Sequence, residues 1–131
     1  MSRTILVDRL LEFVNPFSPL NLHEVDVLAK LHSVPIRRRW RERIDYEDFD
    51  WDVGRIAFFV TRYDLGKKVD PIELESEVSN GSIYGPTIID GHHRLAAAKI
   101  AGSKTIKADF SGRTDVWDYL TGKRKYPPED L

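Results

Sequence analysis

Hydrophobic residues recur at every third or fourth position between residues 51 and 65, which is the spacing of one face of an α-helix. Asp50 or Asp52 can start this helix, and Gly66 can end it. The stripe that should face the core consists of Ile56, Phe59, Val60 and Tyr63. The pattern therefore predicts a long amphipathic helix in the middle of the chain.

The first third of the chain predicts its elements less sharply. Residues 5–14 mix the spacing of a helix with that of a strand, and both alternatives stay open. Further on, Asn21 can cap a helix in which Glu24 returns the bond, as in a capping box. The apolar face of this helix would carry Leu22, Val25, Leu28, Ala29 and His32. We expect His32 at the edge of the core rather than as a ligand.

The second half of the chain predicts strands. Residues 71–74 have the composition of a strand, and the turn-forming residues 79–82 direct the chain back into a second strand at residues 83–89. Residues 104–109 alternate as a half-buried strand, and Thr114 can cap a short final helix. The strand residues expected to be buried are Leu74, Ile88, Ile89 and Ile106. Together these elements predict an α/β (α+β) fold in which a small mixed sheet packs with helices.

Composition narrows the class of protein. The 131 residues suit one compact domain, and we expect residues 1–131 to form it. The absence of cysteine excludes disulfides, thiolate zinc sites and cysteine nucleophiles. No apolar run reaches the length of a membrane span and the start lacks a signal-peptide core, so we expect a cytoplasmic protein without a membrane partner. The formal net charge of −1 gives no overall attraction to a polyanion.

An apolar strand runs directly into a polar turn and a helix predicted at residues 90–102. Asp90 can cap this helix. The residues that follow it at the helix start are Gly91, His92, His93 and Arg94. Phosphate suits such a turn, because glycine lets a ligand approach the backbone and the helix N-terminus attracts anions. A structural interpretation stays open: Asp90 is only a cap, the histidines are solvated, and Arg94 pairs with a surface acid.

This turn resembles that of the ParB/sulfiredoxin superfamily, whose members place Gly-x-x-Arg between a strand and a helix. Residues 91–94, Gly-His-His-Arg, stand where ParB proteins carry Gly-Glu-Arg-Arg and sulfiredoxin carries Gly-Cys-His-Arg. With the preceding aspartate, the turn is similar to the Asp-Gly-His-His-Arg type of the free-serine kinases. The resemblance covers residues 51–110, whereas residues 1–50 are divergent and residues 121–131 form a tail.

The resemblance implies that residues 91–94 bind a nucleoside di- or triphosphate with Mg²⁺, which the protein hydrolyses or uses to transfer phosphate to a small molecule. Sulfiredoxin chemistry is excluded, because His92 replaces the nucleophilic cysteine. Asp90 is the first candidate for the catalytic carboxylate and for a contact to the nucleotide-bound Mg²⁺. Glu24 is the second, since the segment around it resembles a His-Glu segment of the serine kinases. Structural zinc is not expected, because His92 and His93 diverge by about 100° on a helix and no third ligand follows.

A basic cluster surrounds Trp40 and consists of Arg37, Arg38, Arg39, Arg41 and Arg43. Arginine next to an aromatic ring is typical of proteins that bind single-stranded nucleic acid, which fits the "ParB-like nuclease" label of superfamily relatives. Acidic residues follow at once between residues 45 and 52, so the charges can instead neutralise each other. Three functions therefore stay open: a nucleotide-dependent enzyme, a nucleic-acid-binding protein or nuclease, and a non-catalytic interaction module.

Overall fold

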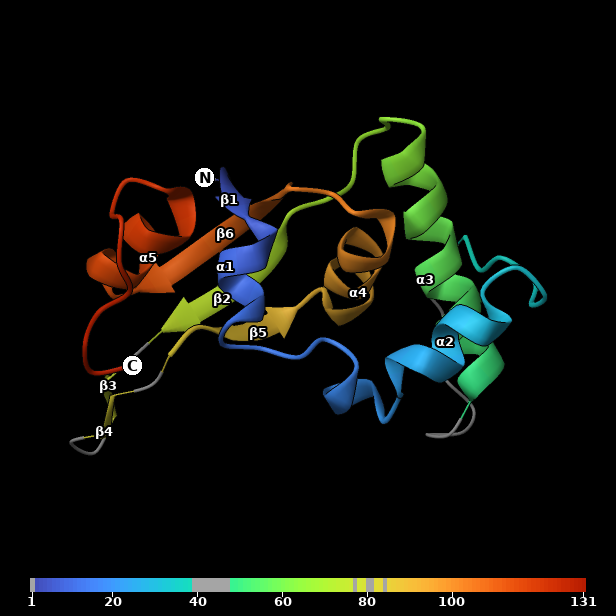
Figure 1. The fold of residues 1–131 in the computed structure, drawn as a ribbon, viewed down its shortest axis with the longest axis horizontal. Coiled ribbons are helices and arrows are strands. Elements are labelled where there is room, and N and C mark those ends of the chain that lie inside the picture. The colour runs from blue at the N-terminus through green and yellow to red at the C-terminus, as the bar shows by residue number, and fades with distance from the viewer. Residues whose placement is uncertain (1, 39–47, 77, 80–81, 84) are drawn as a thin grey trace. The chain divides into compact units, whose positions relative to one another are not determined.

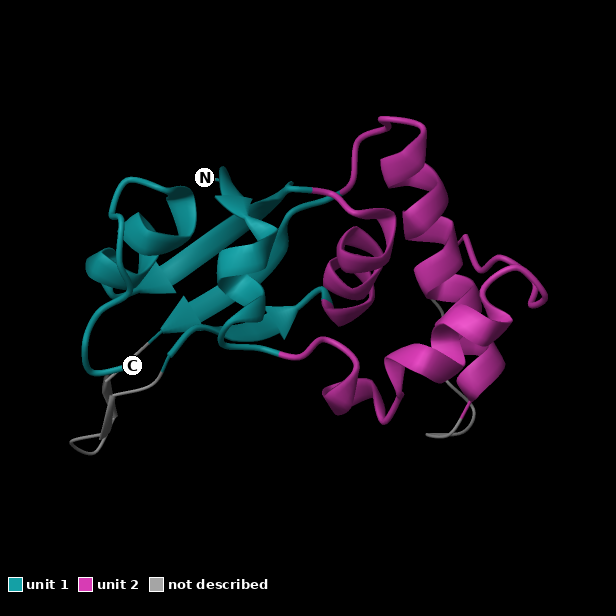
Figure 2. Ribbon diagram, in the orientation of Figure 1, with its two compact units in different colours: residues 1–14, 70–91, 104–131 teal, residues 15–69, 92–103 magenta. Residues whose placement is uncertain are grey.

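The computed structural model describes residues 2–38, 48–76, 78–79, 82–83 and 85–131. These residues form a four-stranded mixed sheet, a small two-stranded ladder and five α-helices (Figure 1). They belong to two compact units, which Figure 2 distinguishes by colour. Unit 1 comprises residues 1–14, 70–91 and 104–131, and unit 2 comprises residues 15–69 and 92–103. The predicted mixed α/β class is confirmed, while the ParB/sulfiredoxin-like fold and the single-domain organisation stay predictions.

The large sheet of unit 1 has the strand order β1-β6-β2-β5 (Figure 1). Its strands are β1 (Arg3–Leu6), β2 (Ile72–Ser76), β5 (Thr87–Asp90) and β6 (Thr105–Gly112). β6 runs parallel to β2, whereas the outer pairs β1–β6 and β2–β5 are antiparallel. The short strands β3 (Val78–Ser79) and β4 (Ser82–Ile83) pair with each other between β2 and β5 in the sequence. The helices of this unit are α1 (Val7–Leu11) and α5 (Thr114–Thr121), which both contact β1.

Alternation along the strands builds the core of unit 1. The buried apolar strand residues are Ile5, Ile72, Leu74, Ile106 and Ala108, and the helices add Val7, Leu10, Val116 and Leu120. The predicted burial of Leu74 and Ile106 is confirmed. The ambiguous residues 5–14 contain both alternatives in turn, because β1 passes directly into α1. The cap predicted at Thr114 is wrong: Thr114 is the first residue of α5, and Arg113 before it makes no side-chain capping bond.

Unit 2 is helical. Its described residues form the 3₁₀ turn η1 (Ser18–Leu20) and the helices α2 (Glu24–Lys30), α3 (Phe49–Asp64) and α4 (His92–Ala101). Its core residues are Phe17, Leu22, Val27, Leu31, Val53, Ile56, Ala57, Phe59, Val60, Ala96 and Ala97. Among the described residues, no helix combines the length and the apolar character that a membrane span requires.

The predicted central helix is α3, but its start lies earlier than expected. Asp48 is the N-cap, and its Oδ1 accepts from the backbone N–H of Trp51 at 3.0 Å. The start predicted at Asp50 or Asp52 is therefore wrong. The end at Gly66 is confirmed, since this residue has a φ of 67° two positions after the helix.

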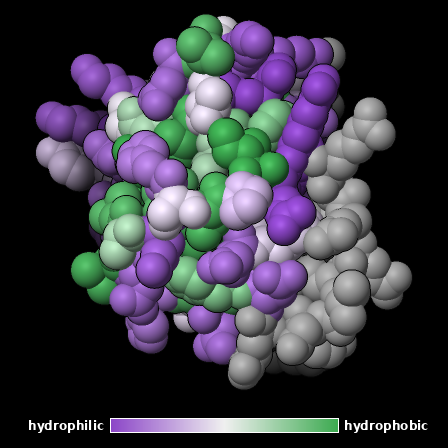
Figure 3. Space-filling model, turned by 90° about the vertical axis from the view of Figure 1, so that its right-hand side faces the viewer, coloured by the Kyte–Doolittle hydropathy of each residue, from purple (hydrophilic) through white to green (hydrophobic). Residues whose placement is uncertain are grey.

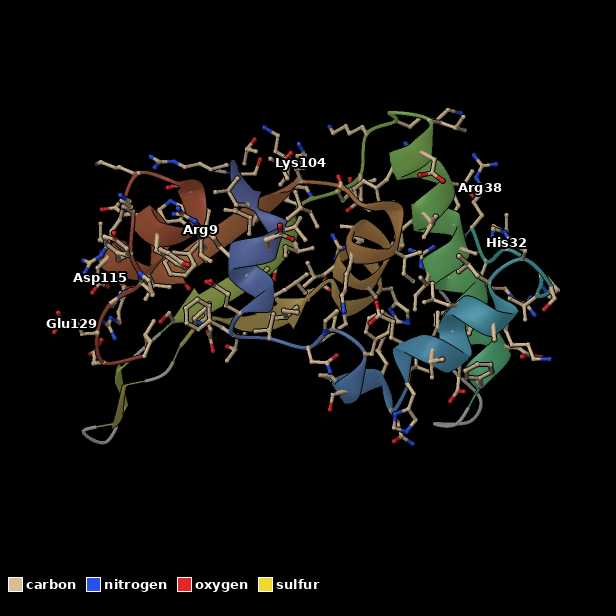
Figure 4. All side chains as sticks on the ribbon, in the orientation of Figure 1. Arg9, His32, Arg38, Lys104, Asp115 and Glu129 are labelled. Atoms are coloured by element: carbon tan, nitrogen blue, oxygen red, sulfur yellow. The ribbon has the colours of Figure 1, made fainter. Side chains whose placement is uncertain are left out.

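The prediction of which side of α2 faces the core is wrong. Val27 and Leu31 are buried, whereas Val25 and Leu28 are 72% and 50% exposed. Figure 3 views the molecule from the side where α2 and α3 lie and shows hydrophobic residues at the surface among hydrophilic ones. His32, expected at the core edge, is exposed in the loop after α2 (Figure 4). The capping box fails as well, because Asn21 has a φ of 56° and ends the 3₁₀ turn instead.

Candidate phosphate-binding site

The predicted strand, turn and helix around residue 91 are present. β5 ends at Asp90, Gly91 has a φ of 115°, and α4 begins at His92. A side chain at position 91 would also meet a buried neighbour, because a Cβ there would lie 2.5 Å from Cγ2 of Ile72. Both the conformation and the lack of space require glycine at the entry to this helix. The helix begins two residues after Asp90, and capping of α4 by the Asp90 side chain stays a prediction.

A bulge in β5 determines where the Asp90 side chain lies. Leu74 pairs with Ile88 and Glu73 pairs with Asp90, so Ile89 is an extra residue in the ladder. Neighbours in β2 point to opposite faces, and the bulge therefore turns Asp90 away from the face of Ile88. The burial predicted for Ile89 is wrong, because this bulged residue is 52% exposed, and Ile88 is only half-buried.

Asp90 joins a row of carboxylates on the polar face of the sheet. Its partner Glu73 in β2 pairs on the other side with Asp109 in β6. Asp90 and Glu73 are exposed, and Asp109 is half-buried. Within the described ranges, no three His, Cys, Asp or Glu side chains are grouped so that they could hold a metal ion. A Mg²⁺ contact of Asp90 therefore stays a prediction that depends on a nucleotide supplying the other ligands.

His93 is paired with a buried carboxylate. Its Nε2 lies 2.8 Å from Oδ1 of Asp52, and the two side chains are 12% and 1% exposed. The imidazole ring stands edge-on to the indole of Trp51, with 5.7 Å between ring centroids. The burial of Asp52 could have been predicted from the sequence, because Asp52 lies four residues before Ile56 on the buried stripe of α3. Interpreting Asp52 as a helix cap left its pairing with His93 unpredicted.

Arg94 is half-buried, and its positive charge lowers the pKa values of two residues of α3. Burial raises the pKa of Tyr63 above its ordinary value, and the charge of Arg94 opposes this increase. Burial also lowers the pKa of Arg55, and Arg94 lowers it further. In the part of the chain that the structure describes, the Tyr63 hydroxyl is buried without a hydrogen-bond partner. The first turn of α4 therefore brings a second guanidinium into the neighbourhood of Arg55.

Arg55 also anchors the beginning of the arginine-rich segment. Its guanidinium donates to the carbonyl oxygens of Arg37 and Arg38 at 3.2 and 2.6 Å. Gly54 permits this approach, because a Cβ at position 54 would lie 2.2 Å from the carbonyl oxygen of Pro35. The remaining predicted members of the basic cluster, Arg39, Arg41 and Arg43, lie outside the described residues.

Glu24, the second predicted carboxylate, is the first residue of α2 and pairs with α4. Its Oε2 lies 2.7 Å from Nζ of Lys99. Lys99 lies five residues beyond Arg94, which is a rise of about 7.5 Å along the helix. Glu24 therefore contacts the last turns of α4 rather than its first turn. Its catalytic role stays a prediction.

Comparison of the chain with protein-family models, with curated proteins and with solved structures finds no match. The resemblance of residues 51–110 to the ParB/sulfiredoxin superfamily therefore stays a prediction.

Proposed function

We propose that the protein binds the phosphate groups of a nucleoside di- or triphosphate, together with Mg²⁺, at Gly91, His92, His93 and Arg94. The observation that carries the proposal is the turn at Gly91, where backbone with a positive φ leads straight into the first turn of α4. The first N–H groups of a helix have no partner within the helix, and the macrodipole makes this end positive. A guanidinium in the same turn adds charge-assisted hydrogen bonds to a phosphate.

The reaction proposed for this site is hydrolysis of the nucleotide or transfer of its phosphate to a small molecule. Phosphoryl transfer needs positioning and charge neutralisation more than covalent chemistry by the protein. Asp90 is the carboxylate proposed to orient the nucleophile or to contact Mg²⁺, which is supported by its exposure just before α4. Its substitution by asparagine keeps the size of the side chain and removes the charge. We expect Asp90→Asn to bind nucleotide and to lose phosphate release, and retained turnover would exclude the role.

Nucleotide binding is tested first by thermal shift against ATP, ADP, CTP and GTP, each with and without Mg²⁺, since a ligand of the native state raises the apparent stability. Calorimetry then compares wild type with Arg94→Ala. We expect Arg94→Ala to weaken binding roughly tenfold to a hundredfold, or about 1.5–3 kcal/mol, as for one hydrogen bond to a charged group.

The matched control is Lys104→Ala, which removes one positive charge from an exposed position shortly after α4 (Figure 4). It should leave the affinity unchanged. If Arg94→Ala binds every nucleotide as tightly as wild type does, the proposed phosphate site is wrong. Nucleotide binding without any turnover by wild type would instead support a non-catalytic interaction module.

Glu24→Gln tests the second carboxylate. This variant keeps the side-chain size and weakens the ion pair with Lys99. A large loss of phosphate release at unchanged nucleotide affinity would support a catalytic role. Unchanged turnover would leave Glu24 only with its contact to α4.

A second candidate function is binding of single-stranded nucleic acid. It is favoured by the exposed basic residues 123–125 and by Tyr126, which is 67% exposed and carries the Lys125 ammonium 5.3 Å from its ring centroid. Basic residues next to an exposed aromatic ring suit a phosphate backbone and a stacked base. Affinity for a single strand should fall steeply with salt and fall again in Tyr126→Ala. Absence of binding at low salt would remove this candidate.

A further inference from the structure

The side chain of Asp52 is a charged group in a place where charged groups are rare. It is 1% exposed and lies in the first turn of α3, close to the apolar core residues Val53 and Ile56. Aspartate is almost never fully buried unless it is paired, because removing a carboxylate from water is costly. An apolar residue would fill such a position at lower cost. A carboxylate at this position therefore requires a specific partner.

The partner of Asp52 is a residue of the proposed phosphate site. Nε2 of His93 lies 2.8 Å from Oδ1 of Asp52, and the ring of the neighbouring Trp51 is nearly perpendicular to the imidazole, with an interplanar angle of 88°. Two consecutive residues of α3 thus fix both the position and the plane of the ring. The imidazole of His93 is held from one side by a hydrogen bond and from another by an aromatic contact.

The pairing also determines the position of a proton. An ionised carboxylate can only accept hydrogen bonds, so Nε2 of His93 must carry the hydrogen in this contact. In the imidazolium form both ring nitrogens donate, so Nδ1–H is then the group that can donate to a phosphate oxygen while Nε2–H stays on the carboxylate. Nδ1 is the ring nitrogen bonded next to Cγ and is therefore the one nearer to the backbone of the first turn of α4. This is the backbone to which the proposed phosphate binding is assigned.

We propose that Asp52 is a positioning residue, which fixes the tautomer and the orientation of His93 in the first turn of α4 and thereby raises the affinity of this turn for phosphate. The effect on phosphate affinity rests on the proposed function. The tautomer and orientation of His93 concern the free protein and are independent of any ligand. We assign the effect of Asp52 on phosphate to His93, because a side chain that is 1% exposed is not accessible to a ligand in solvent.

The test compares Asp52→Asn with Asp50→Asn. Asparagine at position 52 can accept from Nε2–H or donate to a bare Nε2, so it no longer selects one tautomer. Asp50 lies in the same turn of α3 but is exposed, which makes Asp50→Asn the matched control for loss of charge. Imidazole nitrogen chemical shifts, assigned with a His93→Gln variant, report the tautomer in the absence of ligand. Calorimetry with inorganic tripolyphosphate and with ATP, each with Mg²⁺, reports the affinity.

We expect wild type and Asp50→Asn to show Nε2-protonated His93, and Asp52→Asn to show a mixture of tautomers. Asp52→Asn should bind tripolyphosphate and ATP about tenfold more weakly, the scale of one charge-assisted hydrogen bond. In a His93→Gln background, Asp52→Asn should cause no further loss, because the residue it positions is absent. Urea unfolding of each variant confirms that it is folded.

The proposal is overturned by a neutral His93 that carries its proton on Nδ1 in wild type, or by an Asp52→Asn variant with unchanged tautomer and affinity. An equal loss of affinity in the presence and in the absence of His93 would assign Asp52 a general structural role and also overturn it. If wild type binds neither probe, the proposed function and the affinity part of the inference fail together. The chemical shifts then still decide whether Asp52 sets the tautomer.

Discussion

Replacing Gly91 by alanine tests whether the turn before α4 has room for a side chain. Two penalties act on this variant. A positive φ costs an L-residue about 1–2 kcal/mol. In addition, the new Cβ would lie 2.5 and 2.8 Å from Cγ2 and Cβ of Ile72, a fully buried residue that has nowhere to move. Overpacking of this kind costs about 1–3 kcal/mol, so the total loss of unfolding free energy should be about 2–5 kcal/mol.

Gly102→Ala is the matched control at the other end of the helix. Gly102 has a φ of 69°, and a Cβ there would meet nothing within 4 Å. This control has a φ that L-residues can adopt and no overlap, and the stiffening of the unfolded chain by alanine is the same in both variants. The difference between the two variants therefore contains the overlap with Ile72, about 1–3 kcal/mol, together with the additional backbone cost of a φ of 115°.

Equilibrium unfolding in urea, followed by circular dichroism, measures both variants against wild type. A double variant, Gly91→Ala with Ile72→Ala, should lose less than the sum of the two single losses, because the smaller side chain removes part of the overlap. If Gly91→Ala and Gly102→Ala are equally destabilising, the close approach to Ile72 has no energetic weight and the account of this turn is wrong.

Three further variants test the surrounding structure. Asp48→Ala should cost about 1 kcal/mol in urea unfolding, because it removes the N-cap of α3, and an unchanged midpoint would contradict the cap. Gly112→Ala should cost about 3 kcal/mol or more, since its Cβ would lie 1.8 Å from the carbonyl oxygen of Ser76 at a φ of 118°; wild-type stability would refute this contact. A hydrogen bond from Arg113 lowers the pKa of Asp115, so the pair stabilises the fold above the ordinary aspartate pKa and loses this effect on acidification. The difference in urea midpoint between wild type and Asp115→Asn should therefore shrink from about pH 7 to about pH 3, and a constant difference would exclude the effect.

Local patterns in the sequence predicted the elements that depend on local chemistry. The stripe of α3 and the alternation of β6 follow directly from their side chains, and Gly66 ended α3 because glycine readily adopts a positive φ. The turn before α4 was predictable for the same reason. Its glycine and its basic residues are consecutive, so no distant contact was needed to find them.

The features that the sequence did not predict depend on partners far away in the chain. On α2, Val27 is buried and Val25 is exposed. Both faces of this helix carry apolar residues, so its own sequence does not show which face packs against the core. The bulge at Ile89 arises from register against β2, and a strand considered by itself alternates without interruption. The pairing of Asp52 with His93 joins two helices that a long stretch of chain separates. An acidic residue near a helix start is predicted as a cap unless this partner is known.

The position of β1 has a consequence for synthesis of the protein in the cell. β1 emerges from the ribosome long before β6, but Ile5 pairs with Ile106, and β6 pairs with both β1 and β2 in the sheet. At ordinary rates of translation, β1 waits roughly 5–20 s for its partner. During this time its backbone hydrogen-bonding groups are unpaired and open to other strands, including those of neighbouring nascent chains. A chain that is released before Thr105 would keep this edge permanently open, so premature termination should yield fragments that aggregate or are degraded rather than fragments with partial activity.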